Sequence, residues 1–513
     1  MTVTILKKIG GVAEMVTLAN ILDKHLSNKT SIIIPNGPTI NYLKLHSEIE
    51  RVAEILAGAG IKKGRAVSIV LGNNLEFMIL FLAVTRAGAI AAPLNPAYTI
   101  DEFKFYMEDT DAQLVLISNQ SDFAIKAAND LNIEIATITL TEAGSIEIYK
   151  NGNILTTRKD VEPPNENDVA LFLHTSGTTN KPKGVPLTHR NLISSLSNIS
   201  KTYSLSESDI ALVVMPLFHV HGLIGVALTS LYSGGVIVIP DRFSASTFWQ
   251  MQSTHSATWY SAVPTIHQIL LMRANDDKAP SKSFRLIRSC SAALAPSVFD
   301  QLENRFGAPV LEAYGMTEAS HQMSSNLLPP GTRTPGTVGI GTGVQIAIMG
   351  DKGILLPPLS IGEVVIKGSN VTNGYHNNNT ANTEAFTDGW FRTGDQGKLS
   401  MQNILTLTGR LKELINRGGE KISPLEIDST LIRHPAVSEA VCFGIPDEKY
   451  GEIVQAAVVL SKEANESDII KFCSKHIANF KIPTRIHIVD ELPRTATGKI
   501  QRRHIAAKFI IKD

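Results

Sequence analysis

Short apolar runs alternate with amphipathic helical patterns along most of the chain. One helical pattern spans residues 45–56, and the apolar run 67–71 follows it after a turn residue, Gly64. Similar strand-like runs lie at residues 113–117, 211–215, 236–239, 258–263 and 310–313. Because alternating strands and helices build parallel sheets covered on both faces, the pattern predicts an α/β protein with mostly parallel sheets flanked by helices.

The length of 513 residues exceeds the ~250–300 residues that one hydrophobic core usually serves, so at least two domains are expected. Glycine and proline become frequent after about residue 330, and strand candidates follow at 363–367 and 404–408. This change predicts a small β-rich subdomain over about 330–410, which completes an N-terminal domain of residues 1–410. From Leu411 the pattern is typical of a separate α+β unit, so a small C-terminal domain is expected over 411–513.

Charge and cysteine content limit the classes of partner. Lys and Arg together number 48, as do Asp and Glu, so we expect neither a nucleic-acid nor a membrane partner. The apolar stretch 77–94 contains Arg86 and Gly88, which predicts a buried helix leading into a short strand rather than a membrane span. Three widely spaced cysteines predict buried thiols in a reducing compartment. With no clear signal peptide and no SKL-type C-terminus, the expected location is cytoplasmic.

The loop TSGTTNKPKGV, residues 175–185, follows the apolar run 169–173. Its backbone N–H groups and hydroxyls can donate to phosphate oxygens, and its lysines add positive charge. It is not a Walker A sequence, because no Gly-Lys-Ser/Thr opens a following helix. Two interpretations stay open at this point: a phosphate-binding loop, or a surface loop rich in small polar residues.

The segment Tyr314-Gly315-Met316-Thr317-Glu318 directly follows the strand-like run 310–313. Ligands of open α/β sheets collect beyond the carboxyl ends of strands, so these side chains are well placed for a nucleotide. Tyr314 is suited to stacking on a base, Thr317 to a phosphate, and Glu318 to Mg²⁺. The alternative is a plain helix N-terminus with Thr317 and Glu318 in its first turn.

Two further segments contain polar side chains beside glycines. Asp395 ends the segment 390–395 and precedes Arg410, and a carboxylate there is suited to ribose hydroxyls, although a lone Gly-Asp is more often a turn. Lys499 ends the segment 494–499, where a lysine on a glycine-containing loop is usually exposed to solvent. A functional role for Asp395 and Lys499 therefore depends on a nucleotide site nearby.

Taken in order, TSGTTNKPKG, YGMTE, GWFRTGD, GRLKE and TGKIQRR resemble the motifs of the adenylate-forming superfamily over essentially the whole chain. That superfamily contains acyl-CoA synthetases, adenylation domains of peptide synthetases, and luciferases. The resemblance implies that a carboxylate attacks the α-phosphate of ATP, and that a thiol, usually coenzyme A, then displaces AMP. It also implies Mg²⁺ as a cofactor.

The resemblance assigns expected roles to matching residues. Residues 175–184 would hold the β- and γ-phosphates, and residues 291–293 and 312–314 would line the adenine. Thr317 would contact the α-phosphate, Glu318 would bind Mg²⁺, and Asp395 with Arg410 would bind the ribose. The full expected ATP-binding set is Thr175, Ser176, Gly177, Thr178, Thr179, Lys183, Gly184, Ser291, Ala292, Ala293, Glu312, Ala313, Tyr314, Gly315, Thr317, Asp395, Arg410 and Lys499.

Lys499 matches the catalytic lysine of the superfamily and would bridge the attacking carboxylate and the α-phosphate. The C-terminal domain would then rotate, with Lys412 at the hinge position, and would bring Gly418 and Gly419 to the coenzyme A. Asn180 stands where the superfamily has glycine; because Asn tolerates a left-handed φ, the loop shape is expected to survive.

The segments expected to surround the acyl group are polar rather than apolar: 216–222, 288–291 and 319–321. Their polar side chains suit a small anionic acid, because a buried second carboxylate needs hydrogen bonds or a positive partner. The candidate substrate-binding residues are His219, His221, Ser291 and His321, of which His219 is also a catalytic candidate beside Lys499 and Thr317. Any one of these histidines has a structural role as its alternative.

The strings PLFHVHG, IRSCSAALAP and MTEASH are similar to those of the oxalate–CoA ligases within that superfamily. The resemblance implies an ATP-dependent ligase that joins a small acid, oxalate, to coenzyme A. The alternatives are a medium-chain or 4-coumarate-type aromatic acyl-CoA ligase, and, in another class, a non-catalytic nucleotide- or RNA-binding protein.

Overall fold

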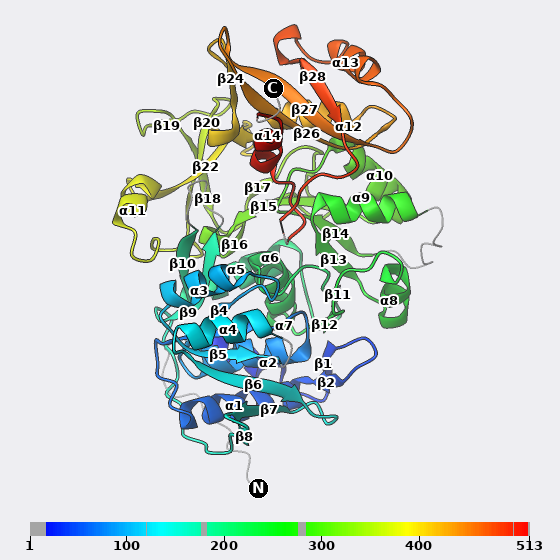
Figure 1. Cartoon of the computed structure of the whole chain (residues 1–513). Coiled ribbons are helices and arrows are strands. Elements are labelled where there is room, and N and C mark those ends of the chain that lie inside the picture. The colour runs from blue at the N-terminus through cyan, green and yellow to red at the C-terminus, as the bar shows by residue number, and fades with distance from the viewer. Residues whose placement is uncertain (1–16, 119–120, 176–181, 275–283, 496, 511–513) are drawn as a thin grey trace.

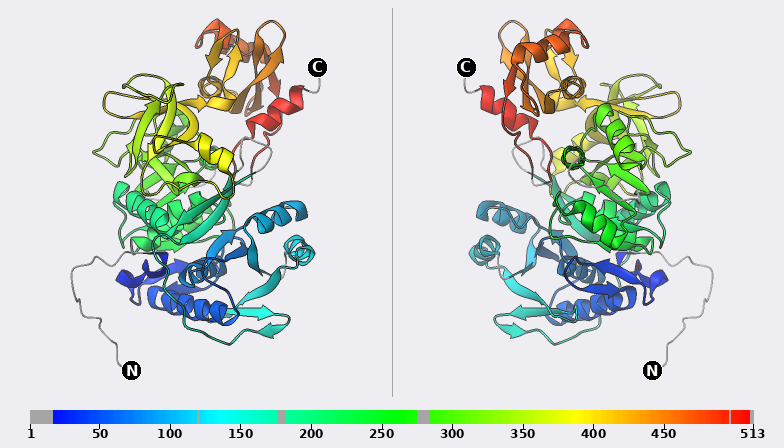
Figure 2. Two further views of the ribbon diagram at one scale, coloured as in Figure 1. Left: turned by 90° about the vertical axis from the view of Figure 1, so that its left-hand side faces the viewer. Right: turned by 90° about the vertical axis from the view of Figure 1, so that its right-hand side faces the viewer.

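The computed structural model describes residues 17–118, 121–175, 182–274, 284–495 and 497–510. Four sheets organise this part of the chain. In Figures 1 and 2 the eight-stranded sheet lies at one end, the nine-stranded sheet in the middle, and the C-terminal sheet at the opposite end. The six-stranded sheet lies beside the middle of the molecule. The predicted α/β class is confirmed.

The eight-stranded sheet has the order β10-β9-β4-β3-β5-β6-β7-β8, and its central strands β9, β4, β3, β5 and β6 are parallel. Every residue from Leu75 to Thr85 in α2 except Glu76 is buried, as expected of a helix that is apolar on all sides. This helix and β4 confirm the prediction for residues 77–94. The elements are α1 (Tyr42–Gly58), β3 (Ala66–Val70), α2 (Leu75–Arg86), β4 (Ile90–Pro93), α3 (Ile100–Asp109), β5 (Ala112–Ile117), α4 (Asp122–Asp130), β6 (Glu134–Leu140), β7 (Ile146–Lys150), β8 (Asn153–Ile154), β9 (Val169–Thr175) and β10 (Lys183–Thr188).

The nine-stranded sheet has the order β17-β16-β15-β14-β13-β11-β12-β1-β2 and is parallel from β15 to β1. The elements are η1 (Leu18–Asn20), η2 (Asp23–His25), β1 (Thr30–Ile33), β2 (Thr39–Asn41), α5 (His189–Thr202), β11 (Ile210–Leu212), α6 (Val220–Gly222), η3 (Leu223–Leu228), α7 (Thr229–Tyr232), β12 (Val236–Val238), α8 (Phe248–His255), β13 (Trp259–Ala262), α9 (Pro264–Arg273), β14 (Leu286–Ser289), α10 (Pro296–Phe306), β15 (Val310–Met316), η4 (Thr317–Ala319), β16 (His321–Ser325) and β17 (Ile340–Gly341).

Two strands end three residues from their predicted ends. The run 211–215 forms strand only to Leu212, because the chain then leaves the sheet toward α6. β15 continues through Tyr314 to Met316, beyond the predicted end at residue 313, since the returning strand β16 pairs with it in antiparallel register. The segment predicted to follow the strand is therefore mostly part of it.

The six-stranded sheet is antiparallel and confirms the β-rich texture predicted after residue 330. The elements are β18 (Gln345–Met349), β19 (Leu355–Leu356), β20 (Gly362–Lys367), α11 (Asn379–Ala385), β21 (Phe386–Thr387), β22 (Trp390–Leu399) and β23 (Leu405–Arg410).

The C-terminal sheet has its own apolar core, which includes Ile427, Leu431, Val454 and Ile469. It follows β23 after the single turn η5, and the exact domain boundary stays a prediction. The elements are η5 (Leu411–Glu413), β24 (Ile415–Arg417), β25 (Glu420–Ile422), α12 (Pro424–Ile432), β26 (Val437–Asp447), β27 (Gly451–Leu460), α13 (Glu466–Ser474), η6 (Asn479–Lys481), β28 (Arg485–Ile488) and α14 (Arg502–Ile510).

The structure also bears on the predictions for the cysteines and for membrane-spanning helices. All three cysteines are buried and unpaired, as predicted: Cys290, Cys442 and Cys473. Among the described residues, no helix combines the length and apolar character needed to cross a membrane.

Candidate active site

The carboxyl ends of β13, β14 and β15 meet at one edge of the nine-stranded sheet. Ala262 pairs with Ser289, and Ser289 pairs with Glu312, in parallel register. The predicted site residues Ser291 and Thr317 directly follow β14 and β15 at this edge. Because α/β sheets bind ligands beyond the carboxyl ends of their strands, this edge is the candidate active site.

The predicted phosphate loop joins two antiparallel strands. Thr175 ends β9, Lys183 begins β10, and the two are register partners. Ser176, Gly177, Thr178 and Thr179 lie outside the described residues, as does Asn180. At Gly184 a Cβ atom would lie 2.6 Å from Cζ of Phe172 and 2.9 Å from Oδ2 of Asp109, so only glycine fits where this strand leaves the loop.

Tyr375 connects the loop to the predicted magnesium ligand. Its hydroxyl donates to Oε1 of Glu318 at 2.9 Å, and Nζ of Lys183 lies 4.5 Å from the centre of its ring. Burial raises the pKa of Glu318, while the Tyr375 hydroxyl and the charges of Arg410 and Lys183 oppose the rise. Tyr375 was not among the residues predicted from the sequence, because no motif marks a tyrosine that reaches the site from a distant loop.

Thr317 and Glu318 form the single helical turn η4, so the expected helix-like turn is present together with the predicted side chains. Among the described residues, no group of three or more His, Cys, Asp or Glu side chains could hold a metal ion. In phosphoryl-transfer sites Mg²⁺ is often held by one or two carboxylates and by the phosphates of the substrate. The single carboxylate of Glu318, close to Lys183, fits that kind of site.

Tyr314, Asp395 and Arg410 form one hydrogen-bonded group. The Tyr314 hydroxyl donates to Oδ2 of Asp395, and Nε of Arg410 lies 2.8 Å from Oδ1 of the same carboxylate. Asp395 and Arg410 are register partners on β22 and β23. Burial raises the pKa of Asp395, and the charge of Arg410 opposes this rise. The structure therefore brings together the residues predicted for adenine and ribose.

The remaining predicted adenine residues lie on β15 and on the loop after β14. Ala292 and Ala293 are exposed on that loop, whereas Glu312 and Ala313 are buried on β15. Burial raises the pKa of Glu312 to about 8, although the backbone N–H of Gly336 donates to it at 2.8 Å. The Glu312 carboxyl is therefore mostly protonated at neutral pH.

Glycine is required at position 315, where β15 and β16 approach closely. A Cβ atom on Gly315 would lie 1.9 Å from the carbonyl oxygen of His321. His321 itself has a φ of 92° and Ser320 a φ of 49°, both in a region that non-glycine residues rarely adopt. Such strained backbone is concentrated at functional sites.

His221 and His321 stack on each other, with ring centres 5.1 Å apart and an angle of 24° between the planes. Nε2 of His221 lies 2.7 Å from Oγ of Ser261, and its Nδ1 lies 3.0 Å from Oγ of Ser291. Both histidines are fully buried, and burial, together with nearby positive charge, holds their pKa values well below the usual range. Three of the four predicted substrate residues thus form one neutral, polar cluster.

His219 lies at the start of α6, where its Nδ1 accepts from the backbone N–H of His221 at 3.2 Å. Burial lowers its pKa to about 3, and the positive charge of Lys499 contributes. The imidazole is therefore neutral and lies within electrostatic reach of Lys499.

Lys499 lies on a tight turn that precedes α14. Its backbone N–H donates to Oγ1 of Thr495 at 3.1 Å, and Arg494 and Ile500 form an antiparallel bridge across the turn. Burial lowers the pKa of Lys499, as does the charge of Arg410, while Asp395 and Glu318 oppose the effect. The predicted catalytic lysine is therefore close to the predicted ribose and metal ligands.

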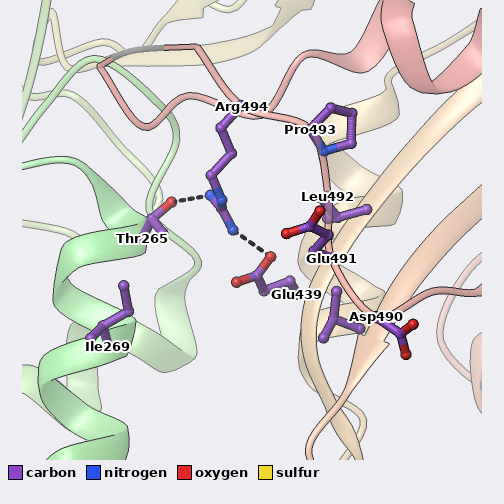
Figure 3. Close-up of a pocket in the computed structure, with 9 residues that line it drawn as sticks. Thr265, Ile269, Glu439, Asp490, Glu491, Leu492, Pro493 and Arg494 are labelled. Carbon is purple, nitrogen blue, oxygen red and sulfur yellow. Dashed lines mark hydrogen bonds and ion pairs between the residues drawn. The ribbon is translucent and has the colours of Figure 1, made fainter.

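Arg494 attaches this turn to the N-terminal part of the chain, at one side of the pocket shown in Figure 3. Its Nη1 lies 2.7 Å from Oγ1 of Thr265 at the start of α9, and its Nη2 pairs with Glu439 on β26. Oγ1 of Thr265 also donates to the carbonyl oxygen of Gly498 at 3.3 Å. Neither Arg494 nor Thr265 was among the site residues predicted from the sequence.

The predicted hinge and coenzyme A residues lie in η5 and in the hairpin of β24 and β25. Lys412 is in the single turn η5, directly after Arg410. Gly418 and Gly419 join β24 to β25 with φ values of 60° and 93°. The backbone N–H of Gly418 donates to Tyr450 at 2.7 Å, and a Cβ atom on Gly419 would meet no described atom within 4 Å. In the described residues, this arrangement does not bring either glycine to the histidines.

Family models match both parts of the chain. The AMP-binding enzyme model matches residues 22–376, and the model of the AMP-binding enzyme C-terminal domain matches residues 426–499. The chain belongs to the AMP-binding enzyme family. The superfamily resemblance predicted from the motifs is confirmed.

Within the AMP-binding enzyme family, the chain is similar to two oxalate–CoA ligases. The one from Arabidopsis thaliana is 49% identical over 511 residues, which covers 97% of this chain and 99% of the relative. The one from Saccharomyces cerevisiae is 45% identical over 520 residues, covering 94% and 95% respectively. Among solved structures, the fold is similar to o-succinylbenzoate coenzyme A synthetase from Bacillus subtilis in complex with ATP and magnesium ion. That TM-score is 0.83 at 28% identity, with 95% of this chain and 98% of the other covered.

Proposed function

We propose that this AMP-binding enzyme is an ATP-dependent acid–thiol ligase that adenylates oxalate and then transfers the oxalyl group to coenzyme A. The observation that carries the choice of acid is the buried cluster of His221, His321 and Ser291, which offers polar groups where a fatty acid would need apolar ones. The likeness to two oxalate–CoA ligases supports the same acid.

In the first half-reaction, one oxalate oxygen attacks the α-phosphorus of ATP, and the bond to the β-phosphate oxygen breaks. The products are oxalyl-AMP and pyrophosphate. Lys499 would lie between the attacking carboxylate and the α-phosphate, where its ammonium offsets the negative charge of both. A lysine suits this role because it acts as a compact charge on a flexible stem.

The other side chains would hold ATP in position. Lys183 and the loop before it would bind the β- and γ-phosphates, and Thr317 would donate to the α-phosphate. Asp395 would accept from the ribose hydroxyls, with Arg410 holding its carboxylate at 2.8 Å. Glu318 would hold Mg²⁺, which supplies charge neutralisation on the phosphates.

In the second half-reaction, the sulfur of coenzyme A attacks the oxalyl carbonyl carbon, and AMP leaves with the electron pair of the broken C–O bond. The thiol gives up its proton, and the product is oxalyl-CoA. We propose that the C-terminal part, residues 411–513, rotates about Lys412 between the two steps. That rotation would withdraw Lys499 and bring Gly418 and Gly419 to the coenzyme A, since small residues leave room for its narrow arm.

A panel of acids tests this proposal. The purified enzyme is incubated with ATP, Mg²⁺, coenzyme A and one acid at a time, and thioester and AMP are measured by mass spectrometry. Oxalate is expected to give equal amounts of oxalyl-CoA and AMP, at a kcat/KM far above those for acetate, hexanoate and 4-coumarate. Turnover of hexanoate or 4-coumarate without turnover of oxalate would instead identify a medium-chain or aromatic acyl-CoA ligase. No turnover of any acid, with ATP still bound, would indicate the non-catalytic alternative.

A further inference from the structure

Arg288 is a fully buried arginine, with 0% of its surface exposed, at the centre of the candidate acyl site. It lies on β14 and donates to three neutral oxygens. Nε donates to the hydroxyl of Tyr203 at 2.8 Å, Nη1 to Oγ of Ser261 at 3.1 Å, and Nη2 to Oε1 of Gln322 at 2.9 Å. Its sequence neighbours predict only a polar segment and indicate no role for the arginine.

Arg288 has no ion-pair partner among the described residues. A buried charge costs several kcal/mol unless a counter-charge or hydrogen bonds offset it, so buried arginines usually face a carboxylate. Its three hydrogen bonds satisfy part of the guanidinium but leave its charge unbalanced.

The surroundings of Arg288 are otherwise neutral or positive. Ser261 is hydrogen-bonded to both Arg288 and His221, so the guanidinium lies directly behind the stacked histidines. The charges of Arg288 and Lys499 both act on His221 and His321, and among the described residues no carboxylate is hydrogen-bonded to these side chains. Because both histidines are neutral, the positive charge that acts on them comes from Arg288 and Lys499.

The same region leaves little room for an acyl chain. A Cβ atom on Gly225 of η3 would lie 2.5 Å from Nε2 of His321 and 3.3 Å from Nη1 of Arg288. The backbone of η3 therefore lies directly against the His321 ring. This contact leaves no space for an acyl chain between η3 and the His321 ring, which favours a short acid.

We propose that Arg288 is a specificity-determining residue, whose charge selects acids that carry a second carboxylate next to the one that is adenylated. The inference rests on the proposed function, since it takes the histidine cluster as the acyl site. Arg288 acts partly through Ser261 and His221. Its positive charge balances the second negative charge of a dianionic acid, which a monoanionic acid lacks.

The decisive variant is Gln322→Glu. It keeps an oxygen acceptor 2.9 Å from Nη2 of Arg288 and gives the guanidinium an internal counter-charge. The kcat/KM for oxalate is expected to fall by at least about 30-fold, as for loss of a buried charge partner, while that for glyoxylate, a monoanion of similar size, stays the same or rises. Arg288→Met removes the charge outright and is expected to shift the selectivity in the same direction, whereas Arg288→Lys keeps the charge and retains more selectivity for oxalate.

Thermal unfolding separates this effect from a fold defect. Since a buried unpaired charge is costly, Gln322→Glu and Arg288→Met are expected to melt no lower than the parent without ligand. The upward shift of Tm with oxalate should disappear in both, while the shift with Mg·ATP remains. The inference is overturned if the ratio of kcat/KM for oxalate to kcat/KM for glyoxylate is the same in Gln322→Glu as in the parent. Arg288 would then have a structural role only.

The acids that the parent enzyme turns over distinguish a failure of the proposed function from a failure of the role of Arg288. If it turns over no oxalate but uses a long or aromatic acid, the proposed function has failed. If it turns over oxalate and the variants keep its selectivity, only the role of Arg288 has failed.

Discussion

Arg494 and Thr265 join the C-terminal part to the nine-stranded sheet through a hydrogen bond of 2.7 Å between Nη1 and Oγ1. Arg494 begins the turn that carries Lys499, and Thr265 lies in the first turn of α9 on the nine-stranded sheet. The contact therefore holds the C-terminal part where Lys499 reaches the predicted nucleotide residues. It must break if that part rotates.

Arg494→Ala is expected to slow adenylation by about tenfold to a hundredfold, the effect of losing a hydrogen bond from a charged group. Thioester formation from preformed oxalyl-AMP should be unchanged, because the contact is not needed there. Single-turnover measurements of each half-reaction check the split. Lys481→Ala, which removes an ion pair with Glu426 inside the C-terminal part, is the control and should affect neither step. Equal slowing of both half-reactions by Arg494→Ala would contradict a role specific to adenylation.

Tyr375→Phe is expected to weaken the use of Mg²⁺. The variant removes the donor to Glu318 but keeps a ring beneath Lys183, so Glu318 loses a group that opposes the rise of its pKa. Adenylation at low Mg²⁺ should fall by about tenfold or more and should recover partly as Mg²⁺ is raised. The matched control is Tyr149→Phe, which removes a similar bond to Glu147 on another sheet. A loss of activity that no Mg²⁺ concentration reduces would contradict this explanation.

Gly419→Leu is expected to slow thioester formation and to spare adenylation, the reverse of Arg494→Ala. The added side chain meets no described atom within 4 Å of its Cβ position, so adenylation should change by less than about twofold. If the C-terminal part rotates, the same side chain would enter the path of coenzyme A and slow thioester formation by more than about tenfold. Gly152→Leu places the same side chain at a similar φ of 77° in another hairpin and controls for backbone strain. Normal thioester formation by Gly419→Leu would contradict the assigned position.

The stability of the fold should decrease with acid because histidines are buried in neutral form. His267 is fully buried, and burial lowers its pKa from the ordinary value of 6.5 to about 4. Between those two pH values the unfolded chain binds the proton and the folded chain does not, so the free energy of unfolding falls as the pH falls. For His267 alone the full loss is about 3 kcal/mol.

Urea unfolding of the parent and of His267→Phe at pH 4.5, 5.5 and 7 measures this contribution. The stability advantage of the parent over the variant should shrink as the pH is lowered, while the effects of carboxylates cancel between the two. A difference that is independent of pH would contradict the predicted titration of His267.

The order of the motifs predicted several residues that the fold brings close to one another, and their role in binding a nucleotide stays a prediction. Thr317 and Glu318 directly follow β15, and Asp395 and Arg410 pair across β22 and β23. Tyr375 could not be predicted in this way, since it reaches Glu318 from 57 residues away on a loop without a motif.

Arg288 was missed for another reason. Its sequence neighbours indicate only a polar segment, and its role depends on being fully buried without a carboxylate partner among the described residues. Burial and the lack of a partner are set by Tyr203, Ser261 and Gln322, which come from three distant segments. A local sequence pattern cannot predict contacts between such distant segments.

The most direct test of the account is exchange of labelled pyrophosphate into ATP in the absence of coenzyme A. Exchange requires reversible adenylation of the acid and nothing later. We expect exchange that depends on oxalate and Mg²⁺, that is lost in Lys499→Ala while ATP binding remains, and that persists in Gly419→Leu. Undiminished exchange in Lys499→Ala, or exchange supported by hexanoate or 4-coumarate but not by oxalate, would contradict it.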